Sequence, residues 1–256
     1  MTAAPARPIP RKVAWRVFWR SLFLQAGFSP EAMQTLGLLY ALAPALKHLY
    51  PDEAAQQEAT RRHLTPFNTH PYAAAAIVGG IIFHEAKVAR GEEPPEAVTR
   101  FKATLMGPLA ALGDGFFWLS LRPAVGVLSC ALVPVVGVFA PVIFLVLYNA
   151  VHLSARAWLF KEALGYGEAV VVRLQTAKVP MWSNRLRLVS ATLAGALGAW
   201  LALRFGALAG GALSVGVALA SLGIGVATVL AVSRRWSPYW LLYGLAGAAV
   251  AGGAFL

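Results

Sequence analysis

The sequence predicts an all-α integral membrane protein, with amphipathic helices at the N-terminus followed by about five or six broken or spanning transmembrane helices. Two properties of the 256-residue chain carry this prediction: 58% of its residues are hydrophobic and only 13% are charged. A soluble domain of this size needs more polar surface to cover its core. The third observation is that most charges flank apolar runs and do not interrupt them. We therefore expect one membrane domain and no second soluble domain.

The net charge of +11 does not point to nucleic acid, because the basic residues are not interleaved with aromatics along a groove. Many of them precede or follow apolar runs, which is the pattern of cytoplasmic loops in membrane proteins. The first twenty residues contain no acid and five basic residues: Arg7, Arg11, Lys12, Arg16 and Arg20. We expect no cleavable signal peptide, since Arg16 and Arg20 interrupt the apolar residues there. The N-terminus is therefore predicted to be cytoplasmic.

Residues 1–71 are predicted to be a cytoplasmic or interfacial region of amphipathic helices. Lys12, Arg16 and Arg20 share one helical face, and Trp and Phe residues fill much of the remainder. Such a helix suits the headgroups of an anionic leaflet, but it could equally pack on the protein's own surface. A second helix is expected from the cap at Ser29-Pro30-Glu31 to Tyr50, kinked at Pro44, and a short soluble helix from Asp52 to about Leu64.

Residues 72–256 are predicted to be the transmembrane domain. The apolar run at 72–83 is too short to cross a bilayer and is expected to be a half-span, a re-entrant segment or a protein-buried helix. Residues 84–102 are interpreted as a surface loop with a short helix after it. The glycines and proline in 103–121 are expected to break the helix there, and the uncharged run 123–151 is too long for one crossing. Pro134 and Pro141 should divide it.

The C-terminal part predicts two crossings joined by a tight turn, because the 46 residues between Arg187 and Arg234 contain a single charge, Arg204. Arg187 and Arg234 should then lie on the same, cytoplasmic side. The uncharged run 239–256 is expected to form the last helix.

Four long strings occur in a fixed order along the chain. They are VFWRSLFLQAGFSPEAMQTLGLLYALAPALKHLY, RRHLTPFNTHPY, LMGPLAALGDGFFWLSLRP and SPYWLLYGLAGAAVAG. In order and approximate spacing they resemble component IID of the mannose, fructose and sorbose family of phosphotransferase-system permeases. The resemblance covers nearly the whole chain.

The resemblance implies a transport subunit of the bacterial cytoplasmic (inner) membrane, multi-pass, and not an enzyme. Component IID pairs with a second membrane subunit, IIC, to form the hexose translocation path. Soluble IIA and IIB proteins carry the phosphoryl group, and IIB phosphorylates the sugar at the cytoplasmic face. The implied partners are therefore IIC, IIA and IIB, a hexose and the lipid bilayer, with no nucleic acid.

The chain departs from the family pattern at three points. It reads GPLAALGDG, with Ala111 and Gly115 where the family usually has GPLAGIGDS, and its region after HEAK is less acidic. It also has only RFGALAGG around Arg204, where relatives carry a longer insert. This shortening keeps a second function open, a reduced, non-transporting assembly or regulatory membrane subunit.

Polar residues within apolar stretches are the candidate substrate-binding groups, because charges at membrane depth usually line a path or form an internal pair. The glycines around Asp114 are expected to open the helix so that its backbone lines a polar cavity. Alternatives stay open: Asp114 as a helix cap or partner-subunit contact, Asn68 and His70 as part of a turn, Trp118 as packing, Asn149 as a helix-to-helix bond. The predicted sugar-binding residues are Asn68, His70, Asp114, Trp118 and Asn149.

A second group of residues is predicted at the interface with the partner subunit, namely Gln25, Gln34 and Arg122. The alternative for Arg122 is that its charged end extends to the membrane surface. His152 and Arg156 share a helical face and are expected to anchor the helix at the interface. No metal site is expected, because the histidines show no HExxH spacing and the single cysteine, Cys130, excludes a CxxC site. No cofactor is expected.

Overall fold

The computed structural model describes residues 9–209, 223, 243–244 and 247, and over these residues the protein is helical. The chain divides into two compact units, Met1–Ser190 and Ala191–Leu256. In chain order the elements are α1 (Arg11–Ser21), α2 (Thr35–Leu49), α3 (Glu53–Arg61), α4 (Ala74–Ala89), α5 (Pro95–Gly113), a π-helix (Asp114–Leu121), α6 (Arg122–Val136), a 3₁₀ turn (Gly137–Phe139), α7 (Ala140–Tyr166), a 3₁₀ turn (Gly167–Ala169), α8 (Val170–Thr176) and α9 (Val179–Ala209).

Helix α4 is the centre of the first unit. Twelve of its sixteen residues are buried, which confirms the protein-buried alternative for the apolar run at 72–83. Its paired glycines permit close approach: a Cβ on Gly79 would lie 2.6 Å from the Phe160 carbonyl oxygen of α7, and one on Gly80 would lie 2.1 Å from the ring of Phe101 in α5. Larger residues at these two positions would push the neighbouring helices away.

The N-terminal helices lie where the sequence predicts them, except that the second helix starts later than expected. Helices α1 and α3 form where predicted, and the Asp52 carboxylate caps α3 by accepting a bond from the Ala55 amide at 2.9 Å. The second helix begins at Thr35, not at Pro30, so the predicted start was wrong. Met33 adopts a φ of 55°, a left-handed conformation that ends any helical turn before it.

The charged segment at 84–102 is mostly helix, which corrects the predicted surface loop. Helix α4 continues to Ala89 and α5 starts at Pro95, so only a short link separates them. The predicted break at 113–115 also does not interrupt the helix. The chain passes from α5 through the π-helix into α6, and the hydrogen-bond ladder widens where the glycines occur.

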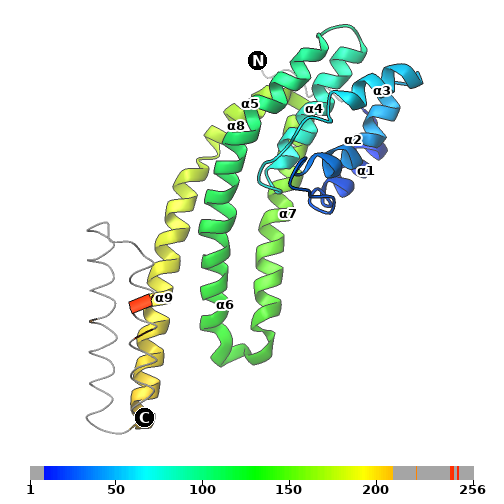
Figure 1. Ribbon diagram of the computed structural model, residues 1–256. Helices are drawn as coiled ribbons and strands as arrows, with labels where there is room; N and C mark the ends of the chain where they lie inside the picture. The colour runs from blue at the N-terminus through cyan, green and yellow to red at the C-terminus, as the bar shows by residue number, and fades with distance from the viewer. Residues whose placement is uncertain (1–8, 210–222, 224–242, 245–246, 248–256) are drawn as a thin grey trace. The chain divides into compact units, whose positions relative to one another are not determined.

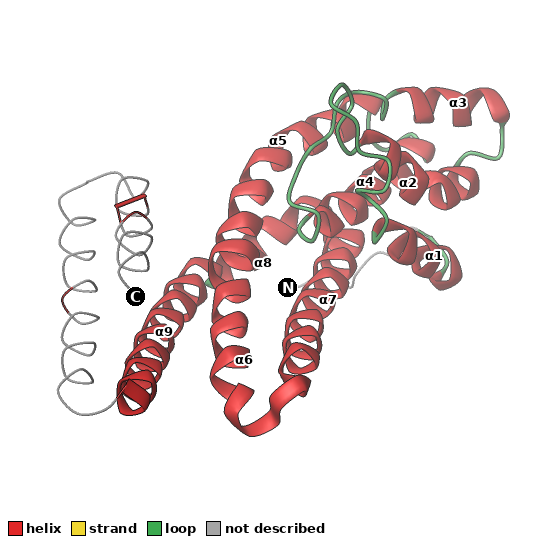
Figure 2. Cartoon of the chain, turned by 60° about the horizontal axis from the view of Figure 1, so that its bottom comes forward, coloured by secondary structure: helices red, strands yellow, loops and turns green. Residues whose placement is uncertain are grey.

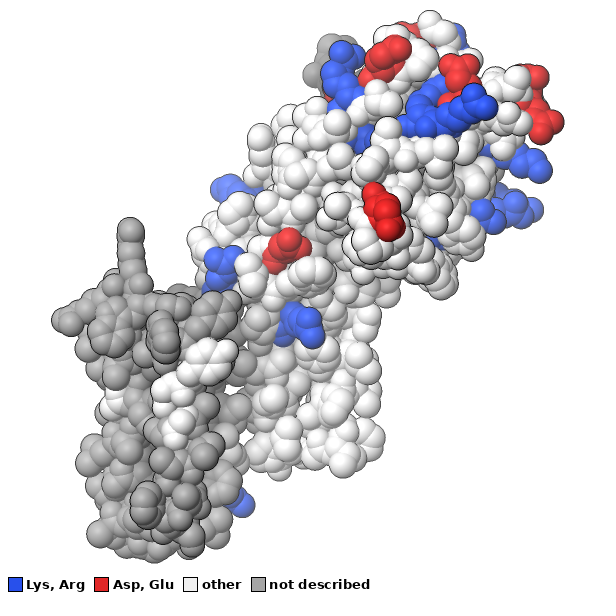
Figure 3. Space-filling view, viewed as in Figure 1, with Lys and Arg blue, Asp and Glu red and all other residues white. Residues whose placement is uncertain are grey.

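Helices α6 and α7 form a hairpin, seen side by side in Figures 1 and 2. Pro134 lies in the last turn of α6 and Pro141 in the first turn of α7, so the predicted division of the uncharged run is confirmed. In the face shown by Figure 3, charged side chains gather around the N-terminal helices, whereas the hairpin is almost without them. This distribution suits a hairpin surrounded by lipid.

Within the part of the chain that the structure describes, one helical stretch, Pro95–Thr176, is long and apolar enough to cross a membrane. Only 6% of its most apolar window is buried inside the protein. Helix α9 contains Arg204 and continues to Ala209, while the rest of the predicted turn, Arg234 and most of the final run lie outside the described residues. The predicted number of crossings and the boundary between residues 71 and 72 stay predictions.

Candidate functional site

The loop at 65–71 is held in place by side-chain bonds at both ends. The Gln34 amide donates to the Thr69 carbonyl at 2.7 Å and accepts from the Thr69 amide at 3.1 Å. The Thr69 hydroxyl donates to the Met106 carbonyl of α5 at 2.9 Å, and Lys102 Nζ donates to the Thr65 hydroxyl at 2.6 Å. The loop is therefore fixed against α5. Gln34, predicted at a partner interface, is only 1% exposed and uses its amide inside the protein.

His70 connects this loop to the π-helix. Its ring is 2% exposed and stacks on Phe117 with centroids 5.2 Å apart and planes inclined by 13°. The rings of Tyr72 and Trp118 pack against it edge to face, each with its centroid 5.0 Å from that of His70. Gly113 makes this packing possible, because a Cβ there would lie 2.3 Å from Cγ of His70. Two strings singled out in the sequence, FNTHP and GDGFFW, are thus in direct contact.

Burial keeps the His70 ring neutral. It lowers the pKa of His70 to about 4, and the positive charge of Arg156 acts in the same direction. Nδ1 accepts a bond from the Tyr72 amide at 3.2 Å, which assigns the proton to Nε2. Nε2 has no partner among the described residues. His70 therefore holds one unused N–H donor at the contact between loop and π-helix.

The π-helix carries a polar contact of its own. The Ser120 hydroxyl donates to the Gly115 carbonyl at 2.6 Å, and Arg187 Nε donates to that hydroxyl at 3.0 Å. A second Arg187 nitrogen lies 3.4 Å from the Gly115 carbonyl. Ser120 and Arg187 thus both place donors at the Gly115 carbonyl of the π-helix. Ser120 and Arg187 were not predicted as site residues, since 67 positions separate them in sequence.

Asp114 begins this π-helix and is partly exposed. Its carboxylate has no ion pair or hydrogen bond within the described part of the chain, so it is not neutralised by Arg122. Arg122 is exposed at the start of α6. Their separation of eight residues corresponds to about 12 Å along a regular helix, which is too far for a direct contact.

A second aromatic and polar group continues from Tyr72 into α7. The His152 ring stacks on Tyr72 with centroids 4.3 Å apart, and its Nε2 lies 2.8 Å from Oδ1 of Asn149. Asn149 also donates to the Leu145 carbonyl of its own helix at 2.6 Å, so the described structure shows no bond from Asn149 to another helix. His70, Trp118 and Asn149 thereby belong to one connected cluster.

The predicted role of His152 and Arg156 as interfacial anchors is wrong. They are 7% and 5% exposed. Arg156 donates to the Ser21 carbonyl at the end of α1, at 2.7 Å, and its guanidinium lies 5.5 Å from the centre of the Tyr72 ring. A cation there stabilises the unpaired carbonyls of a helix C-terminus. The shared face of the two residues was visible in the sequence, but the partner in α1, 135 positions away, was not.

Asn68 and Gln25 are both exposed. Asn68 lies on the fixed loop directly before Thr69, and Gln25 lies in the turn that follows α1. Neither side chain has a hydrogen-bond partner in the described structure, which leaves both available to a ligand or a second subunit.

A separate buried cluster surrounds Glu85 of α4. Its carboxylate accepts from Tyr50 at 2.6 Å, from Arg62 at 2.9 Å and from His63 at 2.9 Å. Burial lowers the pKa of His63 despite the nearby carboxylate, and burial followed by Glu85 raises the pKa of Tyr50. Neutral His63 and neutral Tyr50 therefore both donate to Glu85, and the cluster joins α2, α3 and α4.

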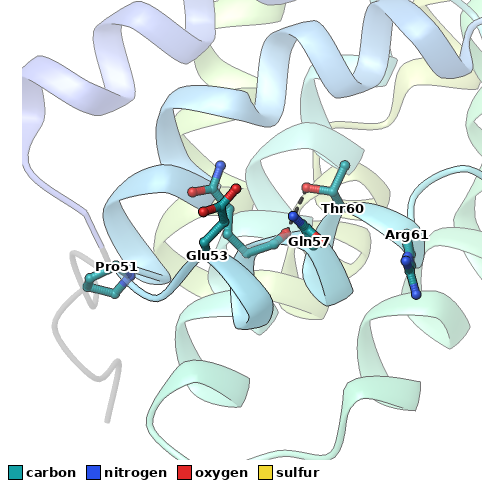
Figure 4. A pocket seen from close by; sticks show the side chains of 6 residues that line it. Pro51, Glu53, Gln57, Thr60 and Arg61 are labelled. Carbon is teal, nitrogen blue, oxygen red and sulfur yellow. Dashed lines mark hydrogen bonds between the residues drawn. The ribbon is translucent and has the colours of Figure 1, made fainter.

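No group of three or more His, Cys, Asp or Glu side chains suited to a metal occurs in the described residues. A hollow of about 490 Å³ lies over α3, lined by Pro51, Glu53, Gln56, Gln57, Thr60 and Arg61 (Figure 4). It is open and polar, and it contains none of the predicted sugar-binding residues.

Comparison with known proteins identifies the family of the chain. The sequence profile described as "PTS system mannose/fructose/sorbose family IID component" matches residues 8–256, almost the whole chain. The chain belongs to this IID family. Its relatives are transport components of permeases and not their catalytic subunits.

Among the curated relatives of this IID chain is the mannose-specific EIID component of Escherichia coli, 37% identical over 156 residues. That alignment covers 60% of this chain and 54% of the relative, so the chain spans about half the length of the relative it matches.

Two solved structures share the fold over nearly the full length of the IID chain. One is a chain of the mannose transporter ManYZ in complex with a microcin, with a TM-score of 0.60 and 25% identity, covering 97% of this chain and 98% of that one. The other is described only as a membrane protein, with a TM-score of 0.76 and 26% identity, covering 96% and 97%.

Proposed function

We propose that this IID chain forms the hexose translocation path of a mannose-family permease together with a IIC membrane subunit. In this proposal IIA and IIB deliver the phosphoryl group, and IIB phosphorylates the sugar at the cytoplasmic face of the bacterial membrane. The observation that carries the proposal is the packing of the 65–71 loop on the π-helix through His70 and Phe117.

This contact supports a sugar site because it gathers groups of the right chemistry on rigid elements. Asn68 offers an amide from a fixed loop, and Asp114 offers a carboxylate without an internal partner. Trp118, 44% exposed beside His70, presents a ring on which a sugar face can stack. A charge kept in an apolar stretch without a partner usually faces a polar path. A π-helical turn is a frequent feature of functional sites.

The proposed role of the IIC subunit is to enclose site residues that this chain leaves exposed. Asp114 and Asn68 are not enclosed by the described residues, so a second polypeptide would complete their surroundings. Gln25 and Arg122, both exposed, are the proposed contacts with that subunit.

The proposed orientation places the N-terminus in the cytoplasm. The exposed cations of α1, among them Arg11, Lys12 and Arg16, would then face the side that carries an excess of positive charge in membrane proteins. A cysteine introduced at exposed Arg61 in a chain with Cys130→Ser should react with a membrane-impermeant maleimide only after the cells are opened. Reaction in intact cells would show that the N-terminal region lies on the opposite side of the membrane.

Uptake measurements test the transport role. Cells that lack this chain but retain the neighbouring membrane subunit should lose accumulation of labelled mannose, fructose or sorbose, and the intact chain supplied in trans should restore it. Unchanged accumulation of all three sugars would contradict the proposal and favour the alternative of a non-transporting assembly or regulatory subunit.

A further inference from the structure

A groove between α1 and α7 has no part in the proposed translocation site. The two helices meet where the rings of Phe18 and Phe160 lie 5.8 Å apart. Beside this contact the surface is hollowed by about 650 Å³. Apolar side chains form its floor and walls: Ala14, Trp15, Phe18, Ala157, Phe160 and Leu164.

Three cations stand around this apolar floor. Arg11 and Lys12 come from the first turn of α1, Lys161 comes from α7, and all three are exposed. None has a carboxylate partner among the described residues, and no acidic residue lines the groove. The acid next in sequence, Glu162, is paired with Arg173 and is 8% exposed. The groove therefore combines an apolar interior with an unneutralised positive rim.

The position of the groove along α7 matches the headgroup level of a membrane. The uncharged run of the hairpin reaches residue 151, and the first charges of α7 follow at Arg156 and Lys161. Exposed apolar side chains such as Leu147 and Leu153 precede the groove on the same helix. The groove thus opens where the apolar part of a spanning helix ends and the charged part begins.

The exposed surface of α1 has the same character on its other side. Trp15, 62% exposed, and Trp19, 48% exposed, meet edge to face at 5.5 Å. A second hollow of about 560 Å³ lies against them and is bordered by Arg16, Arg20 and Lys47. Exposed indoles interspersed with cations are typical of helices in the interfacial layer of a bilayer.

We propose that the α1–α7 groove binds one anionic phospholipid, with its phosphate between Arg11, Lys12 and Lys161 and an acyl chain along Trp15, Phe18 and Phe160. The apolar interior favours a hydrocarbon chain, because burial of each methylene group is favourable and the floor offers no polar side chain to a peptide backbone. The rim favours a negative headgroup over a zwitterionic one. This lipid site does not depend on the transport role.

Photolabelling with lipid probes tests the site directly. The purified full-length chain is reconstituted into phosphatidylcholine vesicles with a trace of phosphatidylglycerol that carries a diazirine at the end of one acyl chain, or with phosphatidylcholine carrying the same group. After irradiation the labelled peptides are mapped by mass spectrometry. The phosphatidylglycerol probe should label residues 14–18 and 157–164 more strongly than the phosphatidylcholine probe.

Two variants separate the headgroup contact from the acyl contact. Lys161→Gln should reduce labelling of the groove by the anionic probe about fivefold, the effect of one surface cation near anionic lipid. Ala157→Trp, which fills the groove and keeps every cation, should abolish it. Arg100→Gln, which removes an exposed cation of α5 outside the groove, serves as the matched control and should leave labelling unchanged.

Three results would overturn the proposal. Equal labelling of the groove by both probes would mean that the rim does not select the headgroup. The same conclusion would follow if Lys161→Gln had the thermal midpoint of the wild-type chain and the anionic probe still labelled its groove as strongly. Absence of groove labelling by both probes would mean that no acyl chain occupies the groove.

Discussion

The imidazole of His70 lies face to face with the phenyl ring of Phe117, with centroids 5.2 Å apart. One residue belongs to the loop at 65–71 and the other to the π-helix, so the stack couples two segments that are 47 positions apart in sequence. Since Gln34 and Thr69 hold the loop from its other side, movement of the π-helix should displace the loop with it.

Gly113→Ala should separate these two segments. The added Cβ would lie 2.3 Å from Cγ of His70, an atom near the backbone that cannot move aside freely. We expect a loss of about 1–3 kcal/mol in the free energy of unfolding, the usual cost of overpacking. Thermal unfolding of the detergent-purified protein measures it.

Gly107→Ala is the matched control in the same helix. No atom lies within 4 Å of the place where its Cβ would be. The substitution should therefore stabilise α5 slightly, by about 0.5–1 kcal/mol, because alanine loses less backbone freedom. Equal destabilisation by both variants would mean that contact with His70 is not the cause.

Glu85→Gln should destabilise the assembly of α2, α3 and α4. The carboxylate accepts bonds from Tyr50, Arg62 and His63, and an amide cannot accept all three or neutralise Arg62, whose side chain is 11% exposed. Removal of one partner from a buried ion pair costs about 3 kcal/mol. Chemical denaturation in detergent checks this.

Glu92→Gln provides the comparison, since it removes the same charge from an exposed pair with Arg90. Exposed ion pairs contribute little, so its unfolding midpoint should match that of the wild type. The interpretation of the Glu85 cluster fails if the two variants unfold alike.

Stability should fall as the pH is lowered from about 6.5, the ordinary pKa of histidine. Burial lowers the pKa of His63 in the folded protein and lowers that of His70 to about 4. Between the folded and unfolded pKa values the unfolded chain binds more protons, so acid favours unfolding, and above this window the effect vanishes. His70→Phe, which keeps an aromatic ring, should make the decline of the thermal midpoint shallower. An unchanged slope would show that folding does not lower the pKa of His70.

Ser120→Ala should impair the π-helix. Its hydroxyl is fully buried and joins Arg187 to the Gly115 carbonyl, so its loss leaves both groups short of a partner. We expect about 1–3 kcal/mol of destabilisation, together with reduced sugar uptake.

Ser129→Ala, in α6, is its control. The buried Ser129 hydroxyl has no hydrogen-bond partner in the described structure, so its removal should be neutral or slightly stabilising. If uptake falls equally in both serine variants, loss of the Ser120 contact is not the cause of the reduced transport.

Much of the fold follows from the sequence where local patterns decide the outcome. The cap at Asp52 and the proline pair at Pro134 and Pro141 set helix ends through nearby atoms, and both were predicted. The apolar run at 72–83 was correctly expected to be too short to span. Its length left a half-span, a re-entrant segment and a buried helix open, and the structure shows the buried helix.

The rest depends on partners that are distant in sequence. Glu85 looks like a surface charge until Tyr50 and Arg62 are placed beside it. In the same way, Arg156 resembles an interfacial anchor because its acceptor, Ser21, belongs to another helix. The glycines around Asp114 predicted an irregular hydrogen-bond ladder, but they did not distinguish a break from the π-helix that the structure shows.

The central claim is that Asn68 and Asp114 border a sugar path shared with another subunit. The most direct measurement is initial uptake of labelled mannose, fructose and sorbose by cells producing the double variant Asn68→Ala, Asp114→Ala at wild-type membrane levels. Gln57→Ala, Glu58→Ala, which removes an exposed amide and an exposed carboxylate from α3, is the control. We predict that the control transports normally and that the site variant loses most uptake of the sugar that the wild type carries. Full-rate uptake by the site variant would contradict the claim.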